Sequence, residues 1–344
     1  MGVSQGMNLT TMLARYEENI EKNLKAVFEG KDIPLYNMMS YQMGWIDEQG
    51  EKVSAGVHLP RKYASMCLLV SEAFGGSASN AMPSACAVEL VNNYSLIHQD
   101  LQDGIPNRNN RSSLWWVWGP AQSINAGDGM HALARLTLLD QRNKEVGPEQ
   151  VLTLIEALDS ACIDICEGEY MDLTYRERVD ISEDAYLNMV EMKSASLMSC
   201  ALKLGAISAN ASLEQVDIIA DFGRKVAVAT QIRDDIFSLW NTKIDESYLS
   251  DEVLNKKKSL PIIFALKNAR GSEKHILGDV YFKRVIDPED INKVIDVLDV
   301  LGAKEYSEQK LIEIKDQALD SLNKLKLPDE FSSQLENIAN ILSV

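Results

Sequence analysis

The sequence predicts an all-α protein built around two central helices, and three observations support this prediction. Apolar residues recur at positions i, i+3, i+4 and i+7 through most of the chain, which is the spacing of one helix face. Glycine and proline, at 19 and 9 of 344 residues, rarely interrupt this pattern. Residues 81–101 and 216–240 are apolar on nearly all sides, and such helices lie inside a bundle.

The other helices are expected to be amphipathic and to surround the central pair. We expect them at residues 12–28, 148–167, 184–204, 289–301 and 305–325, where apolar and polar faces alternate. Turn-forming residues separate the helices, at 74–79, 104–110, 241–252 and 326–330. Because no repeat, low-complexity tract or flexible linker divides the sequence, we expect residues 1–344 to form a single all-helical domain.

Composition excludes several classes of function. The net charge of −17 argues against nucleic acid as a partner, because its phosphates would be repelled. The apolar runs are short and broken by charges, so we expect no membrane span. The first residues lack the layout of a signal peptide. The five cysteines lie in apolar surroundings without metal-type spacing, which indicates reduced thiols and a cytoplasmic protein.

Two short acidic segments lie inside the central helices. Residues three and four apart share a helix face, so each segment places its polar side chains together. The first acidic segment is Gln99, Asp100 and Asp103, and the second is Gln231, Asp234 and Asp235. Either segment alone would be interpreted as a helix cap or a surface ion pair. Two of them inside apolar helices favour a site for hard divalent cations, because buried carboxylates need a partner and Mg²⁺ prefers oxygen ligands.

Further motifs accompany these segments in a fixed order. "ELVNNYSLIHQDLQDG" resembles the pattern ELxHxxSLIHDDxxDG, and "CEGEYMDL" at 166–173 resembles CEGQxxDL. "SSLWWVWGPAQSINAGD" at 112–128, "YLNMVEMKSASL" at 186–197, "QIRDDI" and "KKKSLPII" at 256–263 follow the same family's order and spacing. With these motifs the chain resembles the polyprenyl synthetases, the trans-isoprenyl diphosphate synthases, from about residue 35 to 270.

The resemblance implies an all-α isoprenoid-synthase bundle with a central cavity, usually assembled as a homodimer. It also implies a trinuclear Mg²⁺ cluster that binds an allylic prenyl diphosphate between the two aspartate helices. Breaking the allylic C–O bond concentrates negative charge on pyrophosphate, and Mg²⁺ and basic side chains stabilise that charge. The carbocation left behind needs a dry, apolar cavity.

The positions that bind the allylic diphosphate in this family are nearly all matched. The resemblance assigns the metal to Asp100, Asp103, Asp234 and Asp235, with Gln99 beside them, and the substrate to Arg108, Lys193, Gln231 and Lys257. Asp100, Asp103, Asp234 and Lys193 are the residues we expect to be catalytic. Gln99 departs from the family by replacing its leading aspartate, and no acid at Ser238 or Thr242 closes the second segment.

The positions that bind isopentenyl diphosphate in this family are not matched. Val57, Pro60, Asn92 and Asn109 stand where the family has cationic side chains. His58 and Arg61 lie nearby and could substitute in part. Charge-assisted hydrogen bonds are worth about 1.5–3 kcal/mol each, so the loss of four would abolish useful binding.

This pattern favours a terpene synthase, which ionises an allylic prenyl diphosphate (C15–C25) with Mg²⁺ and releases a terpene and pyrophosphate. Three alternatives remain open. The chain could be a prenyltransferase to another acceptor, an ordinary chain-elongating synthase with a rebuilt isopentenyl site, or a silent subunit of such an enzyme. The retained allylic positions speak against a silent subunit, which has no need of them.

Tyr94 lies five residues before Gln99, about 7–8 Å along the helix at 1.5 Å per residue. In the family a bulky residue at this position limits the length of the prenyl chain. Tyr94 is therefore expected to contact the end of the substrate chain, unless it is an ordinary aromatic residue of the core.

Overall fold

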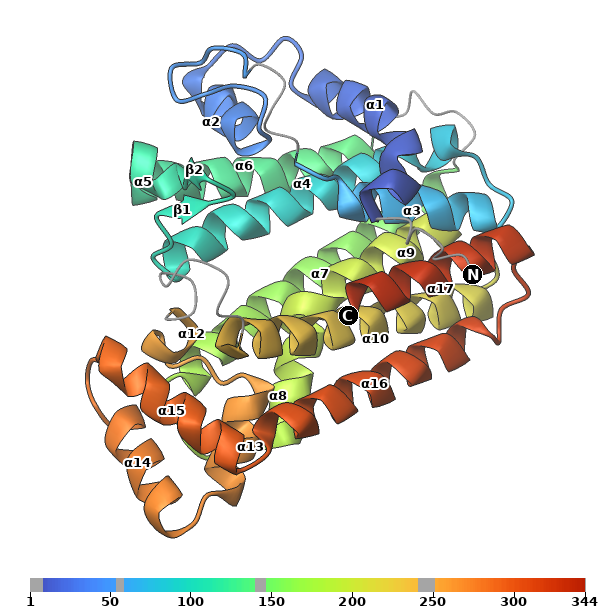
Figure 1. The fold of residues 1–344 in the computed structure, drawn as a ribbon. Coiled ribbons are helices and arrows are strands. Elements are labelled where there is room, and N and C mark those ends of the chain that lie inside the picture. The colour runs from blue at the N-terminus through green and yellow to red at the C-terminus, as the bar shows by residue number, and fades with distance from the viewer. Residues whose placement is uncertain (1–8, 54–58, 140–146, 241–250, 344) are drawn as a thin grey trace, which may run out of the picture. The chain divides into compact units, whose positions relative to one another are not determined.

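Helices make up almost all of the described structure (Figure 1), which confirms the all-α fold predicted from the sequence. The structure is a computed structural model that describes residues 9–53, 59–139, 147–240 and 251–343. Within these residues, β structure is limited to the hairpin β1–β2 and an isolated bridge between Ile46 and Lys52. Val57 and His58 lie outside the described residues.

The chain forms two compact units. The first comprises Met1–Cys162, Cys200–Ala220 and Lys326–Gln334, and the second comprises Ile163–Ser199, Asp221–Leu325 and Leu335–Val344. Four of the boundaries fall inside helices, namely α7 (Pro148–Tyr175), α9 (Ser196–Ser208), α10 (Leu213–Trp240) and α17 (Asp329–Leu342). At these four boundaries the chain passes from one unit to the other within a helix, and the single domain expected from the sequence remains a proposal.

The first unit is organised around α4 (Ala78–Gln102), the first of the two predicted central helices. Ser77 caps its N-terminus by accepting a hydrogen bond from the Asn80 backbone nitrogen at 3.3 Å. The other helices that lie wholly in this unit are α1 (Leu9–Val27), α2 (Pro34–Gln42), α3 (Lys62–Ala73), α5 (Leu114–Trp118) and α6 (Pro120–Leu138). α4 packs most extensively against α6 and α3, and it is buried along most of its length, as its apolar sequence predicts.

A tight hairpin follows α4. Its strands are β1 (Asn107–Arg108) and β2 (Arg111–Ser112), which pair antiparallel. Asn109 and Asn110 form the loop with φ of 52° and 59°. A two-residue loop of this kind needs positive φ at both central positions, which asparagine tolerates better than most residues. The turn therefore places Arg108 close to the C-terminal end of α4.

The second unit contains a helix with a local change of winding. The predicted helix 184–204 is present as α8 (Glu183–Val190), the π-helical turn η1 (Glu191–Ala195) and the start of α9. Its other complete helices are α12 (Asp251–Leu254), α13 (Leu260–Asn268), α14 (Gly271–Tyr281), α15 (Pro288–Val300) and α16 (Ala303–Leu322). π-turns within α-helices are rare and occur often at functional sites.

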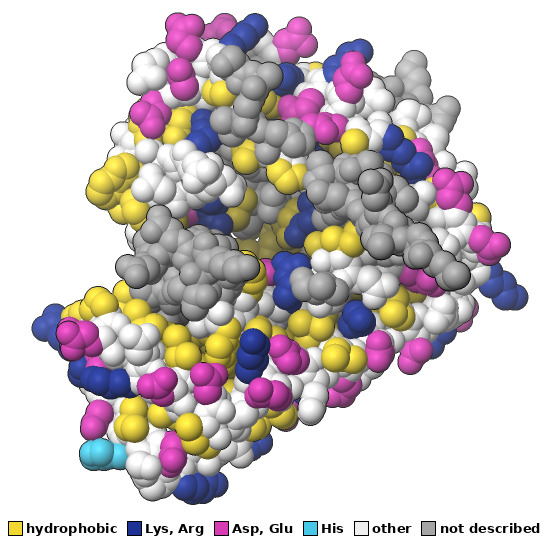
Figure 2. Space-filling model, viewed as in Figure 1, with side chains coloured by type: hydrophobic (Ala, Val, Ile, Leu, Met, Phe, Trp, Pro, Cys, Tyr) yellow, Lys and Arg dark blue, Asp and Glu magenta, His cyan; other side chains and the backbone are white. Residues whose placement is uncertain are grey.

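The surface of the second unit is of mixed charge. In Figure 2, acidic and basic side chains are interspersed over the region of α14, α15 and α16 on the face shown. No helix among the described residues has the length and hydrophobicity needed to cross a membrane.

Candidate functional site

The first acidic segment lies at the C-terminal end of α4 and is hydrogen-bonded to the side chain of Arg108. Asp100 is only 2% exposed. Arg108 donates from Nε to Asp100 Oδ1 at 2.6 Å and from Nη2 to Gln99 Oε1 at 3.3 Å. Burial raises the pKa of the Asp100 carboxyl, and Arg108 opposes this shift. The predicted partners Gln99, Asp100 and Arg108 are therefore brought together.

Asp103 directly follows α4 and is partly buried. The C-terminal end of a helix carries a partial negative charge, so carboxylates are unfavourable there unless a cation is close by. Two acids at this end of α4 indicate that cations compensate them. Arg108 supplies one positive charge to Asp100, and a bound divalent cation would supply more.

The second acidic segment separates into one buried and one exposed carboxylate. Asp235 is 3% exposed and accepts three hydrogen bonds, at Oδ2 from Tyr186 Oη (2.6 Å) and the Leu260 backbone nitrogen (3.0 Å), and at Oδ1 from Gln231 Nε2 (2.9 Å). Burial raises the pKa of Asp235 to about 6 although these donors oppose it. Asp235 thus joins α10, α8 and α13, and it orients the Gln231 amide.

Asp234 points outward from the same helix. Its side chain is 53% exposed, and both hydrogen bonds from Arg233 reach Oδ1, at 3.0 Å from Nε and 2.5 Å from Nη2. Side chains of consecutive helix residues differ by about 100° in direction, so Asp234 is exposed while Asp235 is buried. Asp234 is the acid of this pair that a metal could reach.

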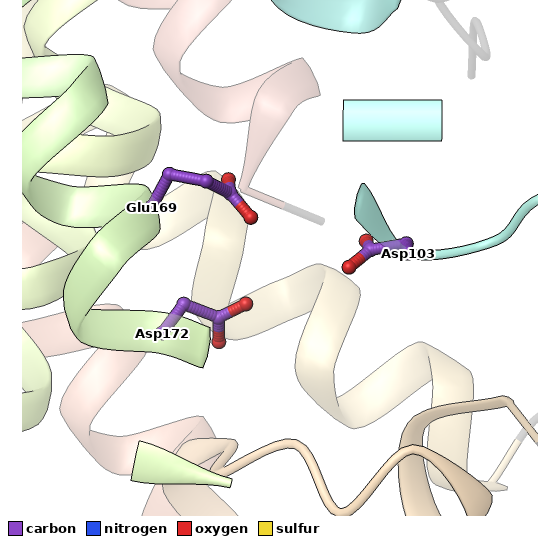
Figure 3. Close-up of side chains that lie close together, drawn as sticks. All are labelled: Asp103, Glu169 and Asp172. Atoms are coloured by element: carbon purple, nitrogen blue, oxygen red, sulfur yellow. The ribbon is translucent and has the colours of Figure 1, made fainter. Parts of the chain in front are cut away.

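Lys193, a predicted substrate-binding residue, is held by two acids that the sequence analysis did not assign. Its ammonium lies 3.0 Å from Glu169 Oε2 and 2.8 Å from Asp172 Oδ2, and Arg176 Nη2 donates to the same Asp172 oxygen at 2.8 Å. Figure 3 shows Glu169 and Asp172 projecting from one side of α7. Burial raises the pKa of Asp172, but Lys193 and Arg176 outweigh it and lower the pKa to about 2.

Gly168 allows this arrangement. A Cβ atom at Gly168 would lie 2.3 Å from the Lys193 backbone nitrogen and 2.7 Å from its Cα. Only glycine permits such a close approach of α7 to η1. The neighbouring Ser194 donates from Oγ to Gln231 Oε1 at 2.9 Å, so η1 contacts α7 through one residue and α10 through the next.

The lysines before α13 differ in environment. Lys257, predicted to bind substrate, is partly exposed. Lys258 is 2% exposed and donates to the backbone oxygens of Arg176 (3.0 Å) and Lys256 (2.7 Å), with its ammonium 4.8 Å from the Tyr281 ring centre. Burial lowers the pKa of Lys258 to about 8. Lys258 therefore stabilises the end of α7, and Lys257 remains the proposed substrate ligand.

Tyr94 is held between two histidines. Its ring centre lies 5.6 Å from that of His98 on α4 and 5.1 Å from that of His131 on α6, and Tyr94 is 6% exposed. His131 Nε2 is buried and has no hydrogen-bond partner among the described residues, and burial lowers the pKa of this histidine. The ring is thus fixed by α6 as well as by its own helix.

Replacing Tyr94 by alanine is expected to lengthen the prenyl chain that the protein accepts or makes, because the large ring is replaced by a methyl group. Tyr94→Phe keeps the ring and should leave the limit unchanged. Mass spectrometry of substrates consumed and products formed measures the effect. An unchanged length distribution in Tyr94→Ala would place the limit at another residue.

The residues nearest the expected isopentenyl diphosphate positions are engaged elsewhere. Arg61 is 5% exposed and donates to Glu21 Oε1 at 2.6 Å and to the Met43 oxygen at 2.7 Å. Asn92 donates to Glu89 Oε1 at 3.3 Å. Asn109 forms the left-handed turn of the β1–β2 hairpin. The Arg61 side chain is only 3% exposed, so a diphosphate could reach it only if the residues around it moved.

In each unit taken by itself, the donor chemistry fits a hard divalent cation. The first segment offers the carboxylates of Asp100 and Asp103, and the second offers the accessible carboxylate of Asp234. Near Lys193, Glu169 Oε1 is buried and has no hydrogen-bond partner in the part of the chain that the structure describes. Oxygen donors without thiolate or imidazole are the set that Mg²⁺ prefers.

Comparison with known proteins places these residues in a family context. The model of the family described as "Polyprenyl synthetase" matches residues 61–298. A (2E,6E)-farnesyl diphosphate synthase of Mycobacterium tuberculosis is 26% identical over 335 residues, covering 96% of this chain and 92% of the relative. A geranylgeranyl diphosphate synthase of the same organism is 30% identical over 271 residues, covering 78% and 76%.

Solved structures agree with the fold. The crystal structure of a polyprenyl synthetase from Streptomyces coelicolor A3(2) superimposes with a TM-score of 0.86 at 26% identity, covering 98% of this chain and 100% of that one. A decaprenyl diphosphate synthase from Rhodobacter capsulatus superimposes with a TM-score of 0.84 at 22% identity, covering 97% of each chain.

Proposed function

The chain belongs to the polyprenyl synthetase family of enzymes, and we propose that it transfers the prenyl group of an allylic prenyl diphosphate to an acceptor, with Mg²⁺ as cofactor. The relatives named as farnesyl and geranylgeranyl diphosphate synthases support a prenyltransferase over the terpene synthase that the sequence analysis placed first. The observation that carries the proposal is that hydrogen bonds fix the side chains of Lys193 and Gln231, the latter through Asp235. The neighbouring carboxylate of Asp234 is accessible.

We assign the metal to the carboxylates of the two acidic segments, above all Asp100, Asp103 and Asp234. When bound, Mg²⁺ neutralises the charge that develops on pyrophosphate as the allylic C–O bond breaks. Asp235 keeps Gln231 in place through the 2.9 Å hydrogen bond from the Gln231 amide. This division of roles follows from exposure, since Asp234 is accessible and Asp235 is buried with three donors around it.

The cations Arg108, Lys193 and Lys257 are assigned to the diphosphate. Arg108 donates to Asp100 and Gln99 through two of its nitrogens and is 29% exposed at the side chain, so Nη1 can bind a phosphate oxygen without losing Asp100. Arginine suits this role because its planar group matches phosphate oxygens. With a net charge of −17, the protein needs such local cations to hold an anion.

A terpene synthase is the second candidate function, and one observation favours it. Among the described residues at these positions, Arg61 is paired with Glu21, Asn92 is hydrogen-bonded to Glu89, and Asn109 forms a tight turn. These positions therefore provide no accessible cation for a second diphosphate. The ionised prenyl group would then react with itself or with water.

The two functions differ in their response to isopentenyl diphosphate. Purified protein is incubated with a panel of C15–C25 allylic diphosphates and Mg²⁺, with and without isopentenyl diphosphate, and the products are identified by mass spectrometry. A longer prenyl diphosphate that appears only with isopentenyl diphosphate would establish the elongating transferase. A hydrocarbon or alcohol formed without it would establish the terpene synthase, and a product formed only with another acceptor would establish a transferase of that kind.

We also propose a homodimer in the cytoplasm. Several large apolar side chains on α5, on α6, directly after α6 and on the first part of α7 are exposed, namely Trp116, Ile124, Leu136, Leu139 and Leu152. A second copy of the chain could cover them. The five cysteines form no disulfide, which is consistent with a reducing compartment.

A further inference from the structure

Glu169 carries a buried carboxylate oxygen that the described residues leave unsatisfied. The residue is 8% exposed, and its Oε1 has no hydrogen-bond partner. Its other oxygen, Oε2, lies 3.0 Å from the Lys193 ammonium. Buried polar atoms are nearly always hydrogen-bonded, so an unpaired carboxylate oxygen calls for an explanation.

The neighbouring cation does not meet this need. Lys193 is shared with Asp172 at 2.8 Å, and Asp172 also receives the hydrogen bond from Arg176. Asp172 therefore has contacts with both Lys193 and Arg176, whereas the contact of Glu169 with Lys193 is made through Oε2 and leaves Oε1 unsatisfied among the described residues. Gly168 packs against the Lys193 backbone too closely for a Cβ atom, so η1 can come no nearer to α7.

The sequence points to the same residue. The family pattern CEGQxxDL has a neutral glutamine where this chain has Glu169. A glutamine there would donate a hydrogen bond and carry no charge. This chain also has the neutral Gln99 where the family has the leading aspartate of its first acidic segment. Compared with the family pattern, this chain therefore lacks a carboxylate at Gln99 and has an additional one at Glu169.

We propose that Glu169 binds a divalent cation through Oε1. The inference rests on the proposed function, in which Lys193 binds a diphosphate. The carboxylate of Glu169, in addition to that of Asp172, would repel this diphosphate. A divalent cation is the group that a carboxylate and a diphosphate can both bind. The acidic pair Glu169 and Asp172, whose ligand oxygens lie within 4.8 Å of each other on one side of α7 (Figure 3), provides an oxygen-lined position for it.

The test measures metal binding in the absence of substrate. Mn²⁺ serves as the probe for the full chain, and free and bound ion are counted by electron paramagnetic resonance. Glu169→Gln has nearly the same shape as the wild type and restores the family residue. It is expected to lose one bound Mn²⁺ or to bind it at least tenfold more weakly. Glu167→Gln, an exposed glutamate two residues earlier on α7, is the matched control and should bind as the wild type does.

Equal Mn²⁺ stoichiometry and affinity in Glu169→Gln and wild type would overturn the inference. Should Glu169→Gln fail to fold by circular dichroism, Glu169→Asp keeps the charge but draws it back by one methylene. That variant should bind Mn²⁺ more weakly than wild type, and unchanged binding would again contradict the proposal. The outcome is separable from the proposed function: a wild type that binds Mn²⁺ through Glu169 but consumes no allylic diphosphate would refute the function alone.

Discussion

Asp172→Ala is expected to destabilise the folded protein by about 3–5 kcal/mol, the typical cost of removing one partner from a buried ion pair. Asp172 is 5% exposed, and its partners Lys193 and Arg176 have side chains only 14% and 13% exposed. The variant would remove the acid that Lys193 and Arg176 share, while Lys193 would keep its contact with Glu169. Urea unfolding measures the change, with Asp180→Ala, from a fully exposed ion pair with Arg178, as the control that should change little.

The same ion pair predicts a dependence on pH. The pKa of Asp172 falls from its ordinary 3.8 to about 2 in the folded protein. A carboxyl with a lowered pKa stabilises the fold above about pH 4, and this contribution of about 2 kcal/mol is lost as the pH falls toward 2. The difference in unfolding free energy between wild type and Asp172→Ala should therefore shrink over that range. A difference that is constant from pH 5 to pH 2 would contradict the assigned ion pair.

Asp234→Ala is expected to lower the rate of pyrophosphate release by about 10²- to 10³-fold, the usual effect of removing one group that stabilises developing charge. Because the Asp234 side chain is 53% exposed, the fold should survive the change. Asp279→Ala, at an exposed acid on α14, is the control that should keep full turnover. If Asp234→Ala retained most of its turnover, the metal would have to be bound by other residues.

Much of the helical architecture follows from local pattern. The strong apolar runs at 81–101 and 216–240 correspond to nearly the whole of α4 (Ala78–Gln102) and of α10 (Leu213–Trp240), because a helix apolar on all sides can be stable only when buried. The π-turn η1 was not foreseen. It spans only Glu191–Ala195, which is too short a segment for a spacing that is followed over a whole helix to reveal.

The sequence pattern does not distinguish the two acids of the second segment. Asp234 and Asp235 are adjacent and chemically identical in sequence, yet one is exposed and the other buried among three donors. That difference depends on Tyr186 and the backbone of Leu260, which come from distant parts of the chain. Such partners cannot be read from the spacing of acids.

Glu169 and Asp172 were present in the quoted motif but were not assigned to the site. Their separation of three residues puts them on one helix face, which was the available signal. Their contact with Lys193 joins α7 to η1 across more than twenty residues of sequence and could not be foreseen. Arg61 shows the converse case, since proximity in sequence suggested a substitute ligand and the structure buries it against Glu21.

The most direct test of the proposed chemistry is the release of pyrophosphate by the full chain. Geranyl, farnesyl, geranylgeranyl and geranylfarnesyl diphosphate are each offered with excess isopentenyl diphosphate, in Mg²⁺ and again after chelation with EDTA. We predict release from at least one substrate in Mg²⁺ and none above background in EDTA. Pyrophosphate released equally well in EDTA, or from none of the substrates in Mg²⁺, would contradict the metal-dependent ionisation of an allylic diphosphate.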